Sequence, residues 1–411
     1  MKEWKSYKLG EISTIQTGPF GSQLHQSDYV ESGVPCIMPT NIGRMLDFQV
    51  AGIAHISEGD ALKLSRHIVH EGDIVYSRRG DIEKCAYVSQ EQDGWFCGTG
   101  CLKITINSNL AVPKFVAYYL STDEIKSWIV GNAVGTTMLN LNTSVLADVP
   151  LSLPSIQMQK RCVQILDSIE NKIALNNRIN HNLEEQAQAL YKSWFVDFEP
   201  FKEGEFVDSE LGLIPEGWRV GTLSELGDIV AGGTPSKAKP EYYTNNGIAW
   251  LTPKDLSAKC NKFTAGGETD ITEDGYRNSS AKLMPRGSVL FSSRAPIGYI
   301  SIAKGDICTN QGFKSVVPTY AGTAYLYYWL CENTEAIEAQ ASGSTFKEAS
   351  GSLMRSFPAL VPEKSVIDSF EKELSPILNE QEILEEEINH AEQIRDSLLP
   401  RLMSGELVMN C

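Results

Sequence analysis

Excess positive charge is missing from this sequence. Its 411 residues contain 36 Lys and Arg against 52 Asp and Glu, which gives a formal net charge of -16. Because the phosphate backbone attracts cations, this balance argues against strong, unassisted binding to nucleic acid. The count averages over the whole chain, so regions that differ in charge have to be considered one by one.

Targeting and metal-binding signals are also missing. The N-terminal MKEWKSYKLG has no apolar segment typical of a secretory signal, and no apolar run reaches the roughly 18 residues of a membrane span. The nine Cys are scattered without a Cys-x-x-Cys pair, and the six His do not cluster with them. We therefore expect a cytoplasmic protein with no membrane association, no disulfide framework and no zinc.

Motifs for phosphate binding and catalysis are absent as well. The chain has no Gly-x-x-x-x-Gly-Lys-Ser/Thr loop and no Pro-Pro dipeptide, which argues against a Walker-type site and an amino-methyltransferase motif. Gly98 and Gly100 lack the third glycine of a dinucleotide-binding loop. Asp81 and Glu83 lack the spacing that nucleases use. These absences favour a binding protein over an enzyme.

What the sequence does contain is a tandem repeat. GVPCIMPTNI (33–42) aligns with GIAWLTPKDL (247–256), and EGDIVYSRR (71–79) aligns with RGSVLFSSR (286–294). AVGTTMLNLNTSVLADVPLSLP (133–154) aligns with ASGSTFKEASGSLMRSFPALVP (341–362), and INH at 179–181 matches INH at 388–390. Four matches in the same order at a nearly constant offset indicate a duplication.

Each repeat changes character towards its end. Short apolar runs broken by Gly, Pro and Asn predict strands and turns over 1–155 and 206–362. From Ile156 no Gly or Pro occurs before Pro200, and a second helical stretch follows Pro362. We therefore expect two globular domains, each followed by a long helix, with the helical segments at 156–205 and 363–411.

Both helical segments carry a seam that alternates steps of four and three residues. This period of 3.5 is typical of helices that pair as a coiled coil. The seam positions are Ile169, Ile173, Asn176, Asn180, Leu183, Ala187, Leu190 and Trp194 in the first segment, and Ile377, Gln381, Leu384, Ile388, Ala391, Arg395, Leu398 and Leu402 in the second.

The apolar stripe of such helices must be covered, and a helix of about 40 residues is roughly 60 Å long. We expect the two helices to cover each other, antiparallel, around a pseudo-twofold axis that relates the repeats. The alternative is that each helix packs on its own globular domain. Asn176 and Asn180 would fix the register of a paired seam, or would be exposed if the seam is short.

Six segments of the chain are distinctive, namely AQALYKSWFVDFEPF (187–201), GLIPEGW (212–218), LSELGDIVAGGTPSKAKPEYY (223–243), SSRAPIGYISIA (292–303), TNQGF (309–313) and SLLPRLMSGEL (397–407). With these segments the chain resembles the specificity subunit of type I restriction-modification enzymes, and the resemblance covers essentially the whole chain. The first half is the looser match, with Gly18-Pro19-Phe20 placed opposite Gly233-Thr234-Pro235, and the usual Glu-Gln at the start of the central helix is Met158-Gln159 here.

The resemblance implies an α+β fold. Two similar target-recognition domains, each a mixed β-sheet with short helices, would be separated by the two long helices paired as an antiparallel coiled coil. Each domain would read one half of a bipartite, asymmetric DNA site, and the helices would set the gap between the halves. Half-sites held a turn or so apart on one face of a duplex suit two readers related by a pseudo-twofold axis.

The resemblance also implies partners. The subunit would do no chemistry itself but would recruit two methyltransferase subunits and two restriction subunits. S-adenosylmethionine, ATP and Mg2+ would be bound by those partners. Two alternatives stay open, namely the specificity subunit of a methyltransferase-only assembly and a coiled-coil scaffold without a role on DNA.

Candidate contacts to double-stranded DNA are cationic and small polar side chains in or near turns. An arginine at a strand end can fork onto guanine or phosphate, but it could equally form an internal ion pair with Asp73 or Asp81. Exposed lysines could be solubilising, and the hydroxyl-bearing loops could be plain turns. The candidates are Asn41, Arg44, Arg78, Arg79, Thr136 and Thr137 in the first domain, and Lys237, Lys254, Ser293, Arg294, Thr345 and Lys347 in the second.

Charge counted by region refines the opening expectation. Residues 363–411 carry 4 basic and 12 acidic side chains, a net charge of −8 that is half of the total. The two globular regions are close to neutral, at −4 for 1–155 and −3 for 201–362. The acidity therefore does not exclude DNA binding, but we expect the solitary chain to bind DNA weakly at physiological salt.

Overall fold

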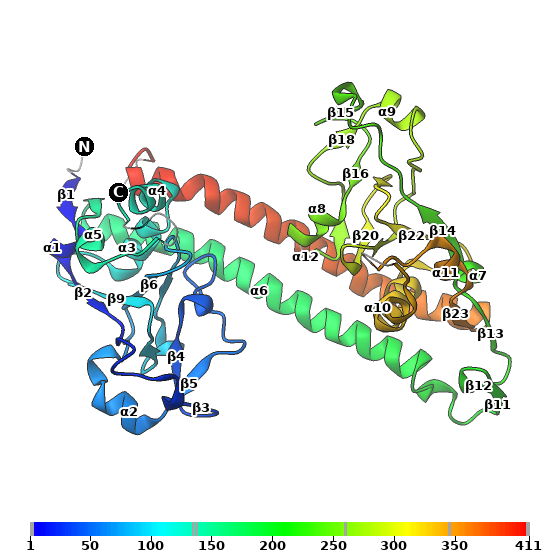
Figure 1. Cartoon of the computed structure of the whole chain (residues 1–411), viewed down its shortest axis with the longest axis horizontal. Coiled ribbons are helices and arrows are strands. Elements are labelled where there is room, and N and C mark those ends of the chain that lie inside the picture. The colour runs from blue at the N-terminus through cyan, green and yellow to red at the C-terminus, as the bar shows by residue number, and fades with distance from the viewer. Residues whose placement is uncertain (1–3, 134, 136–138, 259–260, 344–346, 408–411) are drawn as a thin grey trace. The chain divides into compact units, whose positions relative to one another are not determined.

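The computed structural model describes residues 4–133, 135, 139–258, 261–343 and 347–407. The chain forms two compact units. Unit 1 comprises Met1–Ile173 with His390–Cys411, and unit 2 comprises Ala174–Asn389. Each unit contains one globular domain and a stretch of both long helices, and the domains repeat the same order of main elements (Figure 1).

Unit 1 is built on two four-stranded sheets, with strand orders β2-β9-β6-β7 and β3-β5-β4-β8, and on the pair β1-β10. Strands β4 and β8 are parallel, and the other pairs among the described residues are antiparallel. The strands are β1 (Lys5–Lys8), β2 (Ser13–Thr17), β3 (Tyr29–Val30), β4 (Val34–Ile37), β5 (Ala54–Ile56), β6 (Ile74–Ser77), β7 (Cys85–Tyr87), β8 (Phe96–Cys97), β9 (Cys101–Ile106) and β10 (Pro150–Leu153). The short helices are α1 (Leu9–Ile12), α2 (Glu58–Lys63), α3 (Pro113–Leu120), α4 (Asp123–Asn132) and α5 (Thr143–Ala147).

Unit 2 repeats the plan on a five-stranded sheet with the order β14-β22-β19-β20-β17. Its smaller pairs are β11-β12, β13-β23, β15-β18 and β16-β21, of which the last is parallel, as is β17-β20. The strands are β11 (Phe206–Ser209), β12 (Gly212–Pro215), β13 (Arg219–Thr222), β14 (Gly227–Ala231), β15 (Tyr243–Thr244), β16 (Trp250–Leu251), β17 (Phe263–Thr264), β18 (Asp270–Ile271), β19 (Val289–Ser293), β20 (Ile297–Ala303), β21 (Cys308–Thr309), β22 (Lys314–Pro318) and β23 (Pro358–Val361). The short helices are α7 (Leu223–Leu226), α8 (Pro253–Ala258), α9 (Glu273–Arg277), α10 (Thr323–Gln340) and α11 (Gly351–Ser356).

Strand register is the same in both repeats. Thr17 pairs with Leu102 in unit 1, and Ala231 pairs with Lys314 in unit 2. Residue 17 therefore corresponds to 231, and residue 102 corresponds to 314. The glycine that follows β2 in unit 1 is Gly18, and the glycine that follows β14 in unit 2 is Gly232. Strand register therefore matches Gly18 with Gly232, one position before the Gly233 that stands opposite Gly18 in the sequence comparison.

That glycine sits at a close crossing of two backbones in both repeats. A Cβ added to Gly18 would lie 2.1 Å from the carbonyl oxygen of Gly98. A Cβ added to Gly232 would lie 1.9 Å from the carbonyl oxygen of Asn310. Because no side chain fits at this crossing, glycine is required at the same place in each copy of the fold.

The long helices are α6 (Ile156–Phe195) and α12 (Lys364–Ser404). The Ser155 hydroxyl accepts a hydrogen bond from the Met158 amide at 3.4 Å at the start of α6. Shortly after α6 ends, Phe198 has a left-handed φ of 54°. The expected α+β class, with mixed sheets, short helices and two long helices, is confirmed.

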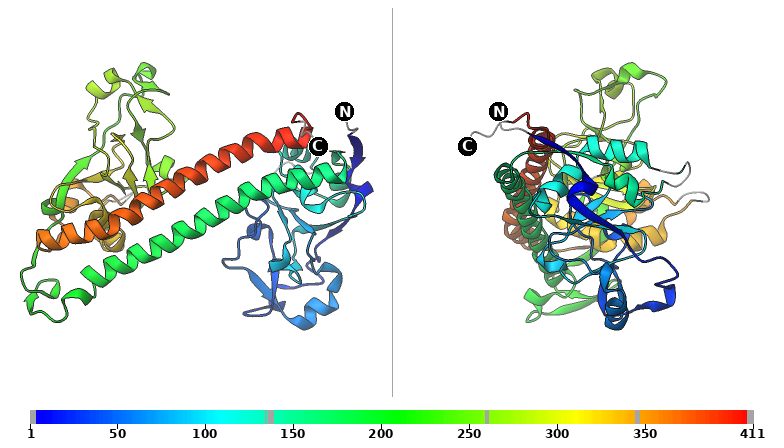
Figure 2. Two further views of the ribbon diagram at one scale, coloured as in Figure 1. Left: turned by 180° about the vertical axis from the view of Figure 1, so that it is seen from behind. Right: turned by 90° about the vertical axis from the view of Figure 1, so that its left-hand side faces the viewer.

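Within each unit, α6 and α12 lie side by side and run in opposite directions (Figure 2). In unit 1, Arg395 contacts Glu170 at 3.3 Å. In unit 2, the Asn176 side chain donates to Glu387 at 2.8 Å. Each of the sixteen seam positions is buried or half-buried, and Asn176 is only 2% exposed. The alternative that Asn176 is exposed because the seam is short is therefore wrong.

The helices also pack on the globular domains, so the two packing modes weighed from the sequence occur together. In unit 2, Tyr191 and Phe195 of α6 join a core with Phe370 of α12 and Tyr325 of α10. The centroids of the Phe195 and Tyr325 rings are 4.8 Å apart in an edge-on arrangement. In unit 1, Leu166 and Leu402 share one core with the sheet.

No helix among the described residues is both long and apolar enough to cross a lipid bilayer. They also contain no group of three or more His, Cys, Asp or Glu side chains arranged to hold a metal ion.

Candidate nucleic-acid interface

Each repeat holds an arginine in a loop that a buried serine braces. In unit 1 the Ser77 hydroxyl donates to the carbonyl oxygen of Arg79 at 3.1 Å. In unit 2 the Ser292 hydroxyl donates to the carbonyl oxygen of Pro296 at 2.9 Å and accepts from the Tyr299 amide at 2.7 Å. Both serines are fully buried. The loops that carry Arg79 and its counterpart at 294 are therefore fixed in shape.

The arginines of unit 1 are available to a ligand. Arg79 is exposed, and the Arg78 guanidinium lies 5.7 Å from the centroid of the exposed Phe20 ring. Among the described residues neither arginine forms an ion pair. Asp81 pairs instead with Lys84 at 3.3 Å.

The arginine of unit 2 shares one carboxylate with a lysine. Arg294 contacts Glu348 at 3.4 Å, and the Lys314 ammonium contacts the same carboxyl group at 3.0 Å. Two cations against one anion leave a net positive charge at this place. The side chains of Arg294 and Glu348 are each about one third exposed, so solvent weakens their attraction.

A cleft of about 750 Å³ opens beside Arg294 in unit 2. Lys237 and Lys254 line it, together with the side chains of Asn310 and Gln311. The remaining lining is Pro240, Tyr243, Trp250, Thr252, Pro253, Thr269, Ala295 and Gly312. The cleft therefore combines cations, amides and aromatic rings, the side-chain types that contact phosphates and base edges.

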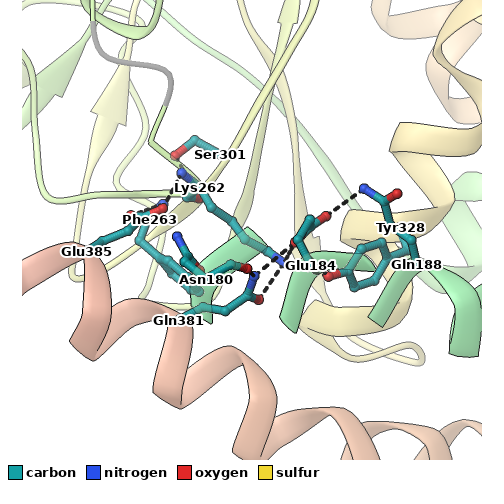
Figure 3. Close-up of polar contacts among 9 residues, drawn as sticks. All are labelled: Asn180, Glu184, Gln188, Lys262, Phe263, Ser301, Tyr328, Gln381 and Glu385. Carbon is teal, nitrogen blue, oxygen red and sulfur yellow. Dashed lines mark hydrogen bonds and ion pairs between the residues drawn. The ribbon is translucent and has the colours of Figure 1, made fainter. Parts of the chain in front are cut away.

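A buried lysine joins the domain of unit 2 to both long helices (Figure 3). The Lys262 ammonium, beside β17, donates to Glu184 of α6 at 2.6 Å, to Gln381 of α12 at 2.8 Å and to the Tyr328 hydroxyl at 2.6 Å. Glu385 of α12 accepts the backbone amide of Lys262 at 2.8 Å. The side chain of Lys262 is 7% exposed.

The electrostatics of this joint follow from burial and pairing. Burial lowers the pKa of the Lys262 ammonium, although the charge of Glu184 opposes the shift. Burial would raise the pKa of Glu184, but the charge and hydrogen bond of Lys262, together with the hydrogen bonds from Gln381 and Gln188, hold the pKa below its usual value. Each ion thus depends on the other, because neither is well solvated.

Comparison with known proteins identifies the chain. The family described as "Type I restriction modification DNA specificity domain" matches residues 1–185 and again 215–393. The chain belongs to this family. The two matches coincide with the two repeats, so the tandem duplication read from the sequence is confirmed.

Individual relatives agree with this assignment. The chain is 24% identical to the type I restriction enzyme HindI specificity subunit of Haemophilus influenzae, over 99% of this chain and 100% of that one. It is 36% identical to the MjaIX specificity subunit of Methanocaldococcus jannaschii, over 44% of each. The crystal structure of a type I S subunit from M. genitalium aligns with a TM-score of 0.64 and 13% identity over 100% of this chain and 97% of that one, which supports the fold.

The chain is therefore a specificity subunit of the type I restriction-modification class, a non-catalytic component with two target-recognition domains. Of the contacts predicted for this specificity subunit, Lys237, Lys254 and Arg294 line one cleft. Arg44 and Lys347 are exposed elsewhere. Thr136, Thr137 and Thr345 lie outside the described residues.

Two predicted contacts of the specificity subunit lie inside it. Asn41 is 4% exposed, and its amide accepts from the Met38 amide at 3.0 Å and donates to the Gln49 carbonyl at 3.1 Å. Ser293 is fully buried, and its hydroxyl donates to the Gly312 carbonyl at 3.1 Å. Both side chains hold the fold together, so we leave them out of the DNA interface.

Sequence reasoning missed the residues that organise the specificity subunit's cleft. In the repeat alignment Ser77 corresponds to Ser292 and not to Ser293, which was the predicted contact. The alignment therefore already indicated the serine whose hydroxyl holds the arginine loop. Asn310 and Gln311 stand in the TNQGF segment, whose amides are a signal for base contacts that the prediction left out. The Lys262 joint had no sequence signal, because its partners come from distant elements.

Proposed function

We propose that the two target-recognition domains each read one half of a bipartite, asymmetric DNA site. The observation that supports this most directly is the repeated arginine loop, braced by a buried serine in both units. A nearby side chain differs between the units, because the exposed Phe20 ring beside Arg78 in unit 1 corresponds by strand register to Thr234 in unit 2. Equal scaffolds with unequal side chains suit two different half-sites.

The interface includes cations of both units. Arg79 and Arg44, which are exposed, serve unit 1, and Lys237, Lys254 and Arg294, which line one cleft, serve unit 2. Cations in these positions neutralise phosphates, and an arginine can also donate two hydrogen bonds to guanine. Thr136, Thr137, Thr345 and Lys347 complete the predicted set, in the segments that repeat from residues 133 and 341.

The long helices set the gap between the half-sites as an antiparallel coiled coil around a pseudo-twofold axis. We divide the chain into recognition domains at 1–155 and 206–362 and spacer helices at 156–205 and 363–411. The buried seam and the Asn176–Glu387 hydrogen bond support a fixed register.

The subunit recruits two methyltransferase subunits and two restriction subunits. These partners supply S-adenosylmethionine, ATP and Mg2+ chemistry, and they neutralise phosphates that this acidic chain cannot. A methyltransferase-only assembly would use the same specificity subunit.

Methylome sequencing tests the proposal. A host expresses the chain with its cognate methyltransferase subunit, either unmodified or as Arg79→Ala or Arg294→Ala. We expect methylated adenines in a two-part motif with a fixed gap. Each variant should weaken recognition of one half only. Arg219→Ala is the matched control, because this exposed arginine pairs with Glu225 at 2.7 Å on the strand β13, outside the cleft.

Two results would contradict the proposal. Methylated adenines without a two-part motif would exclude the bipartite reading. An absence of sequence-dependent methylation or binding, even with the partner supplied, would favour a scaffold with no role on DNA.

A further inference from the structure

We propose that Gln311 reads an adenine in the half-site bound by unit 2, and that Thr234 positions its amide. The inference rests on the proposed function and names the side chain that gives the second half-site part of its sequence. It follows from the geometry of one turn, which lies between β21 and β22 at the edge of the cleft.

The Gln311 amide is oriented but not saturated. Its Oε1 accepts a hydrogen bond from the Thr234 hydroxyl, which holds the amide group in one place. The side chain is exposed, and its Nε2 has no hydrogen-bond partner within the part of the chain that the structure describes. A carbonyl oxygen has two lone pairs, so Oε1 can accept once more. One acceptor beside one donor matches the N6–H and N7 of adenine in the major groove.

The brace itself is held on both sides. The Gly233 carbonyl accepts from the Trp250 indole at 3.0 Å, and the Pro235 carbonyl accepts from the Tyr243 hydroxyl at 2.7 Å. The backbone on either side of Thr234 is therefore restrained. A hydroxyl carried on a restrained backbone orients the Gln311 amide before DNA arrives, which lowers the entropy lost on binding.

The turn that carries Gln311 is also fixed. The Asn310 side-chain oxygen accepts from the Gly312 amide at 2.8 Å, and the Asn310 amide donates to the Leu251 carbonyl at 2.9 Å. The cleft beside the turn is lined by Lys237 and Lys254, whose charges suit the flanking phosphates. A base edge, rather than a small anion, is the ligand that uses the amide and the cations together.

The equivalent place in unit 1 has different chemistry. Strand register matches Gln311 with Thr99, and Thr234 with Phe20. At these two positions unit 1 has the short hydroxyl side chain of Thr99 in place of the long amide and the phenyl ring of Phe20 in place of the hydroxyl that orients it. At this turn the two units therefore have the same backbone arrangement but different side chains, which would make them recognise different bases.

The test measures discrimination rather than activity alone. The chain in complex with its methyltransferase subunit is bound to duplexes in which each base pair of the second half-site is replaced in turn. Gln311→Ala should lower the preference for A·T at one position of that half by about 10- to 100-fold. The first half-site and the gap should not change. Thr234→Val, which keeps the shape but removes the hydroxyl, should weaken the same position by a smaller factor.

Lys237→Ala is the matched control. It should weaken binding to all duplexes alike and reduce the slope of log affinity against log salt by about 1. The inference is overturned if Gln311→Ala keeps full preference at every position, if its loss is uniform across duplexes, or if the second half-site contains no adenine. These results leave the proposed function intact. An unmodified complex with no two-part methylated motif would overturn both.

Discussion

At the scale of single residues, His67 shows how burial sets a charge state. The ring is 2% exposed, and its Nε2 accepts the Arg66 Nε–H at 3.0 Å, so this nitrogen carries no proton. Burial, aided by the charges of Arg66 and Lys103, lowers the pKa of His67 to about 4. The ring is therefore neutral in the folded unit 1 at any pH well above 4.

Because His67 is neutral in the folded protein, we expect the free energy of unfolding to be sensitive to acid. Between pH 6.5 and about 4 the unfolded chain binds a proton at His67 that the folded chain does not. The free energy of unfolding should fall as the pH decreases through this window, by at most about 1.4 kcal/mol per pH unit. Urea unfolding at pH 7 and pH 5 measures the difference. His67→Gln should flatten it, whereas the exposed His181→Gln should not; equal slopes in both variants would contradict the assignment.

Residue-level prediction from sequence was uneven for a physical reason. The arginine loops were found because polar residues after an apolar run mark a strand end. Asn41 and Ser293 were misplaced because a polar side chain beside a turn can face either the backbone or the solvent. The role proposed for Gln311 depends on its hydrogen bond with Thr234, which is 77 residues away in the sequence and could not be paired with it from sequence alone.

At the scale of elements, the long helices followed from periodicity, but one of them breaks a sequence rule. Pro376 and Pro400 lie inside α12, which continues from Lys364 to Ser404. A proline in a helix removes one hydrogen bond and is unfavourable by about 3 kcal/mol. Leu374 and Leu378 flank Pro376 and are buried in the core, so packing offsets the lost bond.

The Lys262 joint makes a prediction about how a domain is held on its helices. Lys262→Met leaves Glu184 without its counter-ion in a poorly solvated place, and we expect a loss of about 3–5 kcal/mol in the free energy of unfolding. The double variant Lys262→Met/Glu184→Gln should recover most of this loss, because no unpaired charge remains. Urea unfolding of the three variants, with Glu184→Gln alone as the third, measures the coupling. Additive losses would show that the two side chains do not act as a pair.

At the scale of the whole molecule, the helices can be tested as a ruler. Seven residues inserted into both α6, after Ile173, and α12, after Asn389, add about two turns and 10.5 Å to each. The gap should lengthen by about three base pairs at 3.4 Å per pair, with both half-sites unchanged. Methylome sequencing reads the gap directly.

A control places the same seven residues at Gly204, in the connection that follows α6. The helices keep their lengths there, so the gap should stay constant. Changed half-sites with a constant gap after the helical insertions would show that the helices do not measure distance.

The charge of the whole chain leads to a separate expectation. With a net charge of -16, the isolated subunit should bind its cognate duplex much more weakly than the complex with the methyltransferase does at about 0.15 M salt. Fluorescence anisotropy with a labelled duplex compares the two. Equal affinities would mean that this chain alone supplies the phosphate contacts.

The division of the chain between its two units has a consequence for the order of folding during synthesis. Unit 2 is one continuous stretch, whereas unit 1 needs the last segment, His390–Cys411, to complete its core with Leu399, Leu402 and Met403. A ribosome working from the N-terminus therefore releases everything unit 2 requires first. The domain that is translated first therefore completes its core last, when Leu399, Leu402 and Met403 of α12 have been synthesised.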